Sequence, residues 1–595
     1  NQVPSNLRVP FVTAEFDSSQ ASQGPALMAY RGLIMGQKIN GSSAASNSLN
    51  RVTNADDVLD LCGRGSNAHL MAKAWFAENT QTELRLLALA DSSSAAFASG
   101  AFVVTGTSTE DGTLHVYVGG QHVEVAVSNG DSASTVASAI ADAIGKRASG
   151  TVTFASATSG DNITVGGTTF VATSGAVTPG AATYSYDTGN TQAAASFAAQ
   201  VNAHATASQL VRATANSAVV TLRAYAGGED GESVILTSVD GVTTAVTGSG
   251  TLTGSTDDTD CPVHAYSSSG TVTLVAKNAG LHGNEIDLRL NYRSSSEETP
   301  AGLSVAVTAM SGGTTNPTLT SGIAALGDLQ FHVIAHPYTD ATSLTAIENE
   351  LSSRFGPMRM IDGLAITAKN DSYANVAALG ETRNSPHSCI LRTNDSPTTP
   401  AEFAASVAGV VARYGADDPA RPFQTLPLTY VLAPAETDRD TLTERNLLLF
   451  DGIATTTVGP GDVVQIERLI TTYQQNASGV DDTAYLDANT LLTLMYLRFS
   501  WRARISSRFP RHKLANDGTR VPSGQAIVTP KIMKAEAVAW FEQMIDLGLV
   551  EDLAQFKKDM IVERNVSNAN RIDLTLPANL INQLMVTAGQ VPFRI

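Results

Sequence analysis

Residues 329–367 read LQFHVIAHPYTDATSLTAIENELSSRFGPMRMIDGLAIT, and this stretch decides the fold class. Its apolar pattern predicts a buried strand at 329–335, a helix at 343–355 and a second strand at 363–367. Two strands joined by a helix lie parallel in one sheet, with a right-handed crossover between them. The stretch therefore predicts an α/β unit built on a mainly parallel sheet.

The same alternation of strands and helices continues on both sides of this stretch. Near the N-terminus, Asn54 is a typical helix-capping residue in front of an apolar periodic segment. We expect further strands at 27–36, 82–89 and 388–391 and further helices at 56–61, 66–78, 373–381 and 401–414. Together with the elements at 329–367 they would form one doubly wound sheet covered by helices, from which residues 93–296 project.

Residues 93–296 contain an internal repeat. They are rich in Gly, Ser, Thr and Val, and Tyr117-Val118-Gly119-Gly120 matches Thr164-Val165-Gly166-Gly167. Gly-Gly between two alternating segments predicts a tight hairpin, because the turn requires positive φ. The segments that begin at Val220 and Val272 also match, at a constant spacing of 52 residues. The order half-module, module, half-module predicts a small domain nested in a copy of itself, and two tandem domains are the alternative.

The length of the chain requires several domains. Its 595 residues exceed what one hydrophobic core normally holds. We expect a multi-domain α+β protein with an α/β core, inserted hairpin and helix domains rich in Gly and Thr, and a mixed α/β C-terminal domain. The expected divisions are an N-terminal extended arm at 1–20, the core at 21–92 plus 322–440, an outer inserted domain at 93–148 plus 261–296, its nested duplicate at 149–260, the C-terminal domain at 441–570 and a C-terminal strand arm at 571–595.

Composition and charge exclude several classes of function. The formal net charge is −18, which opposes binding to a nucleic-acid backbone. No run approaches about 18 uninterrupted apolar residues, so no membrane span is expected. The opening residues lack the basic start and apolar core of a signal peptide. The three cysteines (Cys62, Cys261 and Cys389) are isolated, so neither a disulfide framework nor a cysteine zinc site is indicated.

The chain also lacks recognisable catalytic motifs. We find no Gly-rich phosphate loop with a following Lys, no metal-spaced His and Cys cluster and no Gly-x-Ser-x-Gly elbow. His332 and His336 are four residues apart, but on an expected strand rather than on one face of a helix. His282, Asp287 and a serine could be drawn as a triad, yet triads are defined in space. We therefore expect a protein that is not an enzyme, with no catalytic, cofactor or metal site.

A basic cluster lies in an otherwise acidic chain. Residues 490–534 hold nine Arg and Lys residues against one acid, Asp517. Such a cluster can attract an acidic partner through long-range, salt-sensitive forces; the alternative is a solvated face or one paired within the chain. The residues of interest are Arg498, Arg502, Arg504, Arg508, Arg511 and Lys513.

Both ends of the chain are expected to be extended arms. Pro4, Pro10 and Pro592 oppose helix formation, and apolar residues recur around them. An extended arm exposes unpaired backbone groups, which a neighbouring copy can satisfy by strand addition. The alternative is two frayed termini. The candidate intersubunit residues are Val3, Leu7, Val9, Phe11, Ile572, Leu574, Phe593 and Ile595.

Long motifs in the C-terminal half resemble those of contractile bacteriophage tail sheath proteins. The opening of the chain and the segment around residues 113–125, with 280–292, are similar to the Mu-like branch of that family. The motifs are IERLITTY at 466–473, FPRHKLANDG at 509–518, TPK at 529–531, VERN at 562–565, NRID at 570–573, LINQL at 580–584, PSNLRVP at 4–10 and EFD at 15–17.

The resemblance implies a structural subunit that polymerises as hexameric rings, stacked helically around a tail tube, and that shortens on infection. The implied partners are copies of itself, the tail tube protein, the baseplate and the tail terminator, without a cofactor, nucleic acid or membrane insertion. The implied location is the virion, after assembly in the host bacterial cytoplasm. The insert at 149–260 departs from the family pattern, so a host- or glycan-binding appendage is one alternative. The sheath of a phage-derived secretion or bacteriocin machine is another.

Overall fold

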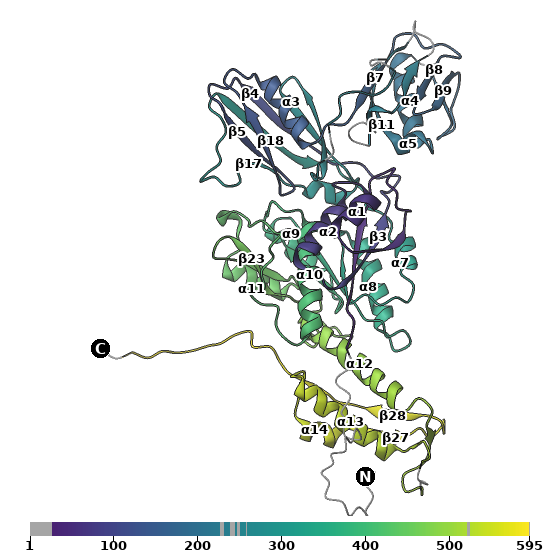
Figure 1. Ribbon diagram of the computed structural model, residues 1–595, viewed down its shortest axis with the longest axis vertical. Coiled ribbons are helices and arrows are strands. Elements are labelled where there is room, and N and C mark those ends of the chain that lie inside the picture. Colours follow the sequence, from purple (N-terminus) through teal and green to yellow (C-terminus); the bar gives the residue numbers. More distant parts are fainter. Residues whose placement is uncertain are drawn as a thin grey trace, which may run out of the picture. The chain divides into compact units, whose positions relative to one another are not determined.

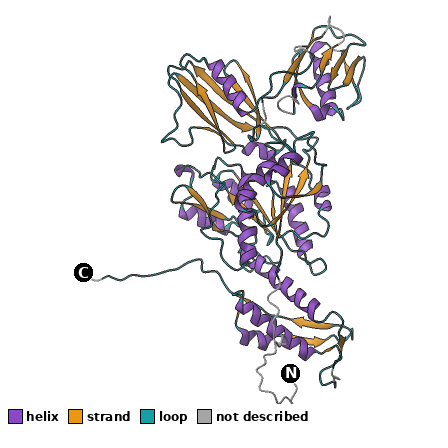
Figure 2. Cartoon of the chain, in the orientation of Figure 1, coloured by secondary structure: helices purple, strands orange, loops and turns teal. Residues whose placement is uncertain are grey.

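The computed structural model describes residues 27–593 except 188, 226–230, 239–243, 247–249, 257–258 and 521–523. The chain divides into two units, of which one is Tyr30–Leu492 and the other is built on residues 493–593. Their elements are labelled in Figure 1, and Figure 2 distinguishes helices from strands. No helix among the described residues is both long and apolar enough to cross a membrane.

A six-stranded sheet forms the centre of the first unit. Its strands are ordered β2-β3-β1-β19-β20-β21, and every neighbouring pair is parallel except β2 and β3. This confirms the mainly parallel sheet predicted from residues 329–367, although β19 begins later than expected. The strands are β1 (Arg31–Gln37), β2 (Ser48–Val52), β3 (Glu83–Leu89), β19 (Val333–Ala335), β20 (Leu364–Lys369) and β21 (Ser388–Arg392).

Helices cover both faces of this sheet, so it is doubly wound (Figure 1). Leu33 and Met35 of β1 pack on one face with Ile347 and Leu351 of α8. On the other face Gly36 lies against Ala68 of α2, where a Cβ would approach the Ala68 Cα to 2.7 Å. The helices that pack around this sheet are α1 (Ala55–Cys62), α2 (Asn67–Glu78), α7 (Thr320–Ala325), α8 (Ala341–Phe355), α9 (Tyr373–Glu381) and α10 (Pro400–Asp417).

Two pairs of small sheets follow β3 along the chain, each pair with its own apolar core and one long helix. The first pair has the orders β15-β16-β4-β18 and β17-β5-β6 and packs around α3 (Ala133–Ile144). Its strands are β4 (Ser99–Gly106), β5 (Gly112–Val118), β6 (Gln121–Val127), β15 (Val263–Ser268), β16 (Thr271–Ala276), β17 (Leu288–Leu290) and β18 (Leu303–Ser311), with the 3-10 helix η2 (Leu281–Glu285).

The second pair has the orders β11-β12-β7-β14 and β10-β9-β8-β13 and packs around α4 (Asn190–Ala203). Both Gly-Gly hairpins predicted from the sequence are confirmed: β5 pairs with β6 and β8 with β9, and all four glycines have positive φ. The elements are β7 (Ser149–Phe154), β8 (Asn162–Val165), β9 (Thr168–Thr173), β10 (Thr183–Ser185), α5 (Ala207–Leu210), β11 (Val211–Asn216), β12 (Val219–Ala224), β13 (Leu236–Ser238) and β14 (Thr244–Val246).

The first unit ends with a small α/β segment. Its helix α11 (Leu442–Phe450) begins with a capping box, in which Thr441 and Glu444 satisfy each other's backbone amides. The strands β22 (Thr455–Gly459) and β23 (Val463–Arg468) form an antiparallel pair, preceded by the 3-10 helix η3 (Glu436–Asp438).

The second unit is a helical layer with three short strand pairs. Trp540 of α13 donates a hydrogen bond from Nε1 to Ser500 Oγ of α12 at 2.9 Å, and the Phe541 ring stacks on Phe556 of α14 with the ring centroids 3.9 Å apart. The elements are α12 (Ala488–Arg508), β24 (Lys513–Leu514), β25 (Ile527–Val528), α13 (Pro530–Asp546), β26 (Val550–Glu551), α14 (Leu553–Asp559), β27 (Ile561–Arg564), β28 (Ile572–Thr575) and β29 (Asn579–Leu580).

Candidate assembly surfaces

The first half of the expected C-terminal arm is paired within its own chain. Ile572 and Leu574 lie on β28, which forms an antiparallel hairpin with β27 through the pairs Arg564↔Ile572 and Val562↔Leu574. The two strands form a sheet of their own among the described residues. Each therefore has one edge toward its partner and one edge with unpaired backbone groups, which is the feature that accepts an added strand.

Strand pairing within the chain ends shortly afterwards. Asn579 and Leu580 pair with β26, and the Ile581 amide donates to the Leu549 carbonyl at 3.2 Å. From residue 582 to residue 593 the chain has no helix or strand and runs away from α13 as an extended segment (Figures 1 and 2). We call residues 582–593 the C-terminal segment.

The C-terminal segment carries exposed apolar side chains at alternating positions. Leu584 is 76% exposed and Val586 81%, and the pair Val591 and Phe593 is 89% and 82% exposed. Side chains two residues apart share one face of an extended strand. The segment therefore presents apolar faces that its own unit leaves in solvent, and of these residues only Phe593 was singled out from the sequence.

The expected N-terminal arm lies outside the described residues, and so do its candidates Val3, Leu7, Val9 and Phe11. Ile595 also lies outside them. Their role in assembly stays a prediction from the sequence.

The basic cluster is partly paired within the chain. Arg504 donates from Nε to Glu536 Oε2 and from Nη1 to Gln543 Oε1, both at 2.6 Å, and Arg508 Nη1 reaches Glu536 Oε1 at 2.6 Å. Glu536 lies on α13, two residues beyond the window in which the charges were counted. The pairing within the chain, considered above as the alternative, therefore holds for these two arginines.

Three of the other four members of the cluster are exposed. Arg498 is half-buried and Arg502 is exposed, and both interact with other groups of the chain. Arg511 and Lys513 are exposed, and Lys513 Nζ donates to Gln525 Oε1 at 2.9 Å. The accessible charge is thus concentrated at the end of α12 and in the loop that follows it.

The histidines weighed for catalysis are parts of the core. His332 accepts a hydrogen bond at Nδ1 from the Arg31 amide at 3.1 Å and stacks on Tyr30, and burial lowers its pKa to about 4. His336 is fully buried, and its pKa is lowered to about 4 for the same reason. The Asp287 carboxylate, considered for a triad from the sequence, pairs with the Arg289 guanidinium, and His282 is hydrogen-bonded to the Asn316 side chain.

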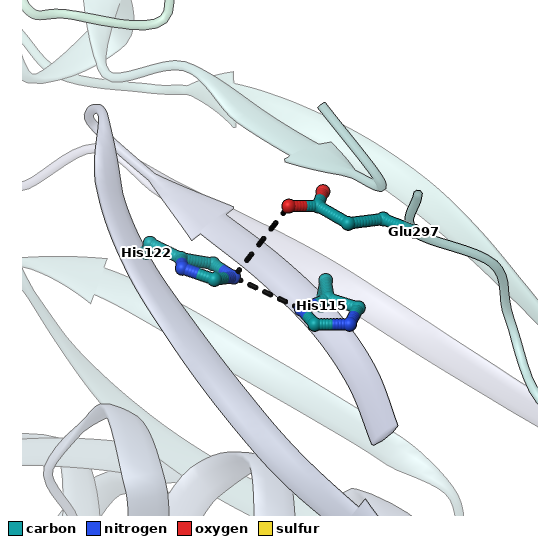
Figure 3. A group of neighbouring side chains, drawn as sticks. All are labelled: His115, His122 and Glu297. Atoms are coloured by element: carbon teal, nitrogen blue, oxygen red, sulfur yellow. Dashed lines mark hydrogen bonds and ion pairs between the residues drawn. The ribbon is translucent and has the colours of Figure 1, made fainter. Parts of the chain in front are cut away.

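One group of metal-ligating side chains escaped the sequence analysis. His115 and His122, from the two strands of the Gly-Gly hairpin, converge with Glu297 from the loop after β17 (Figure 3). In a hairpin with Gly119-Gly120 at the turn, Tyr117 lies opposite His122 and His115 opposite Glu124, so the two histidines share one face of the sheet. This placement could have been worked out from the sequence. Nothing in the sequence places Glu297 beside them.

Family models and a related sequence both match this chain. Residues 312–472 match the family model described as the phage tail sheath protein central domain, and residues 480–594 match the phage tail sheath C-terminal domain. Over 593 residues the chain is 33% identical to the Mu-like prophage FluMu tail sheath protein of Haemophilus influenzae, covering 100% of this chain and 99% of that protein.

Two solved structures also align along most of the chain. A sheath tail protein of Desulfitobacterium hafniense aligns with a TM-score of 0.41 and 11% identity, covering 96% of this chain and 97% of that one. A sheath tail protein of Listeria innocua aligns with a TM-score of 0.40 and 12% identity, covering 94% of each chain.

Proposed function

The chain belongs to the phage tail sheath protein family, and from that premise we propose that its C-terminal segment joins each copy to its neighbours. The family identity confirms the resemblance seen in the sequence motifs. The protein is a structural subunit of the tail sheath of a contractile phage, and proteins of this family assemble into an oligomeric sheath.

The observation that carries the proposal is the contrast between the C-terminal segment and the β27–β28 hairpin. The segment is extended and carries alternating exposed apolar side chains, and the hairpin has two strands with open edges. Adding a neighbour's segment to the hairpin would satisfy backbone groups on both partners and bury the apolar faces. Residues 3–16 would add a further strand from another copy.

Such strand exchange suits a sheath that shortens. Contraction requires two packings of rigid domains, and an extended segment can keep two copies connected while their domains rotate. We propose that the subunits form hexameric rings stacked helically around the tail tube, with the baseplate and the tail terminator at the two ends. The subunits would assemble in the bacterial cytoplasm, and the protein would act mechanically without catalysing a reaction.

The accessible part of the basic cluster is the proposed contact with the tube. Arg502, Arg511 and Lys513 are exposed, whereas the Arg504 side chain is only 10% exposed. Positive charge facing an acidic tube would position the sheath through attraction that weakens with salt.

We propose the division into domains that the sequence predicts. An N-terminal arm at 1–20 would precede the α/β core at 21–92 plus 322–440, and the C-terminal domain at 441–570 would lead into the C-terminal strand arm at 571–595. The outer domain at 93–148 plus 261–296 would hold the insert at 149–260 as a nested duplicate. The strand order β15-β16-β4 in the outer domain corresponds to the order β11-β12-β7 in the insert, and this correspondence supports the duplication.

A truncated chain tests the role of the C-terminal segment. Deleting residues 582–595 should leave the unfolding temperature of the monomer unchanged and should abolish the long polymers seen by negative-stain electron microscopy. Val586→Asp should weaken polymerisation in the same direction, because it places a charge in a buried interface strand. Val480→Asp, at a 59% exposed apolar position outside the segment, is the matched control and should polymerise normally. Abundant polymers from the truncated chain would overturn the proposal.

A further inference from the structure

The β5–β6 hairpin places two imidazoles on one face of its sheet. Tyr117 pairs with His122 and His115 pairs with Glu124, so these four residues alternate with inward-facing neighbours along the two strands. The His115 and His122 rings lie nearly parallel, with centroids 5.3 Å apart, and His122 also stacks on Tyr117. The hairpin therefore fixes the positions of both imidazoles.

A carboxylate from elsewhere in the chain completes the group. Glu297 is 5% exposed, and its side chain accepts hydrogen bonds from the Tyr117 hydroxyl at 2.6 Å and from the Arg293 amide at 3.0 Å. Glu297 is thus an oriented carboxylate, as metal-binding carboxylates usually are.

The three donor atoms lie close together in space. His115 Nδ1 and His122 Nε2 are 3.0 Å apart, and His122 Nε2 is 4.0 Å from Glu297 Oε1 (Figure 3). All three donor atoms lie within 4.8 Å of one another. Ligands at about 2.1 Å from a tetrahedral ion are about 3.4 Å from each other. To reach ligand distance the two imidazole nitrogens would have to separate slightly from 3.0 Å and the carboxylate would have to move toward them.

We propose that His115, His122 and Glu297 bind one divalent transition-metal ion, with Zn²⁺ as the best match. Two imidazoles and one carboxylate are a donor set that Zn²⁺ accepts in tetrahedral geometry. The fourth position is open to water or to Glu124, which is 65% exposed and whose Oε1 lies 3.9 Å from His115 Nδ1. Hard ions such as Mg²⁺ prefer all-oxygen sites and fit this set poorly.

A bound ion would join two separate parts of the outer sheets. The histidines belong to β5 and the edge strand β6, whereas Glu297 lies in the loop between β17 and β18. The ion would tie that loop to the hairpin and add a cross-link to a region with short strands. This role depends on neither polymerisation nor the C-terminal segment, so it can fail independently of the proposed function.

Zinc uptake by the full chain tests the proposal. The purified 595-residue protein, freed of metal with a chelator, should take up one equivalent of Zn²⁺ more in equilibrium dialysis against zinc chloride than either His122→Gln or Glu297→Gln does. Each substitution should weaken binding by at least the roughly 10- to 100-fold loss seen when an outer-shell partner of a metal is removed. Zinc should also raise the unfolding temperature of the wild type.

His512→Gln is the matched control, because His512 is exposed and lies in the other unit. It should bind and be stabilised by zinc as the wild type is. Unfolding scans without metal check that the variants are folded. Equal zinc uptake and equal thermal shifts in the wild type, His122→Gln and Glu297→Gln would overturn the proposal and leave a hydrogen-bonded histidine pair.

Discussion

Arg504 on α12 and Glu536 on α13 form an ion pair whose Nε and Oε2 atoms are 2.6 Å apart. Their side chains are only 10% and 14% exposed, so water screens the pair weakly. Glu536 also pairs with Arg508 through its second oxygen. One carboxylate thus holds two members of the basic cluster against the helical layer of the second unit.

Glu536→Gln should therefore destabilise the second unit. The substitution removes the negative charge of the Glu536 side chain. The Arg504 guanidinium keeps its hydrogen bond to Gln543, but its positive charge is no longer neutralised by Glu536. We expect a loss of about 1–3 kcal/mol, measured as a lower unfolding temperature of the unpolymerised chain.

Glu542→Gln is the control for this substitution. Glu542 and its partner Lys557 are 51% and 46% exposed, so the effect should be small. Equal shifts for the two variants would show that the Glu536 pair has no special role.

Gly36→Ala tests the packing of α2 on the central sheet. The added Cβ would lie 2.7 Å from the Ala68 Cα and 2.9 Å from the Ala68 Cβ, and neither atom can rotate away. Overpacking of this kind costs about 1–3 kcal/mol, which calorimetry should detect as a lower unfolding temperature. Gly589→Ala has no heavy atom within 4 Å of the new Cβ and should leave the temperature unchanged.

Buried histidines predict that the first unit loses stability in acid. Burial lowers the pKa of His336 to about 4 from an ordinary 6.5, and the Tyr338 backbone and Asp340 oppose this only in part. Between these two pH values the unfolded chain is protonated at this residue and the folded chain is not. The contribution of His336 to the free energy of unfolding is therefore complete above pH 6.5. It falls by roughly 3 kcal/mol as the pH drops to about 4.

His336→Leu should flatten this dependence, because it removes the group that takes up the proton. The measurement is the difference in unfolding temperature between pH 7 and pH 5, compared with the wild type. His512→Gln should keep the wild-type difference, since His512 is exposed. An unchanged difference in His336→Leu would assign the acid sensitivity to other groups.

Local sequence signals predicted the elements of the fold well. The alternation of strands and helices predicted the parallel sheet, because two strands joined by a helix can pair in one sheet in only a few ways. Asn54 marked the start of α1, where its side chain accepts a hydrogen bond from the Asp57 amide. The Gly-Gly pairs marked two hairpins because their positive φ angles favour glycine.

Partners far apart in sequence were not predictable in this way. Alternating apolar residues at 571–595 indicated strands, but the pattern cannot tell whether the partner strand is in the same chain. The structure gives β27 as the partner of Ile572 and Leu574 and leaves the C-terminal segment exposed. In the same way, the charge of Arg504 was visible in the sequence but its pairing with Glu536 was not.

The central claim is that the C-terminal segment of one copy is a strand in the sheet of another. A cryo-electron microscopy map of polymers grown from the full chain tests it directly. We expect residues 582–593 to lie as an added strand along the open edge of a neighbour's β27–β28 hairpin. Density showing the segment folded back onto its own α13 and α14, without strand pairing between copies, would contradict the account.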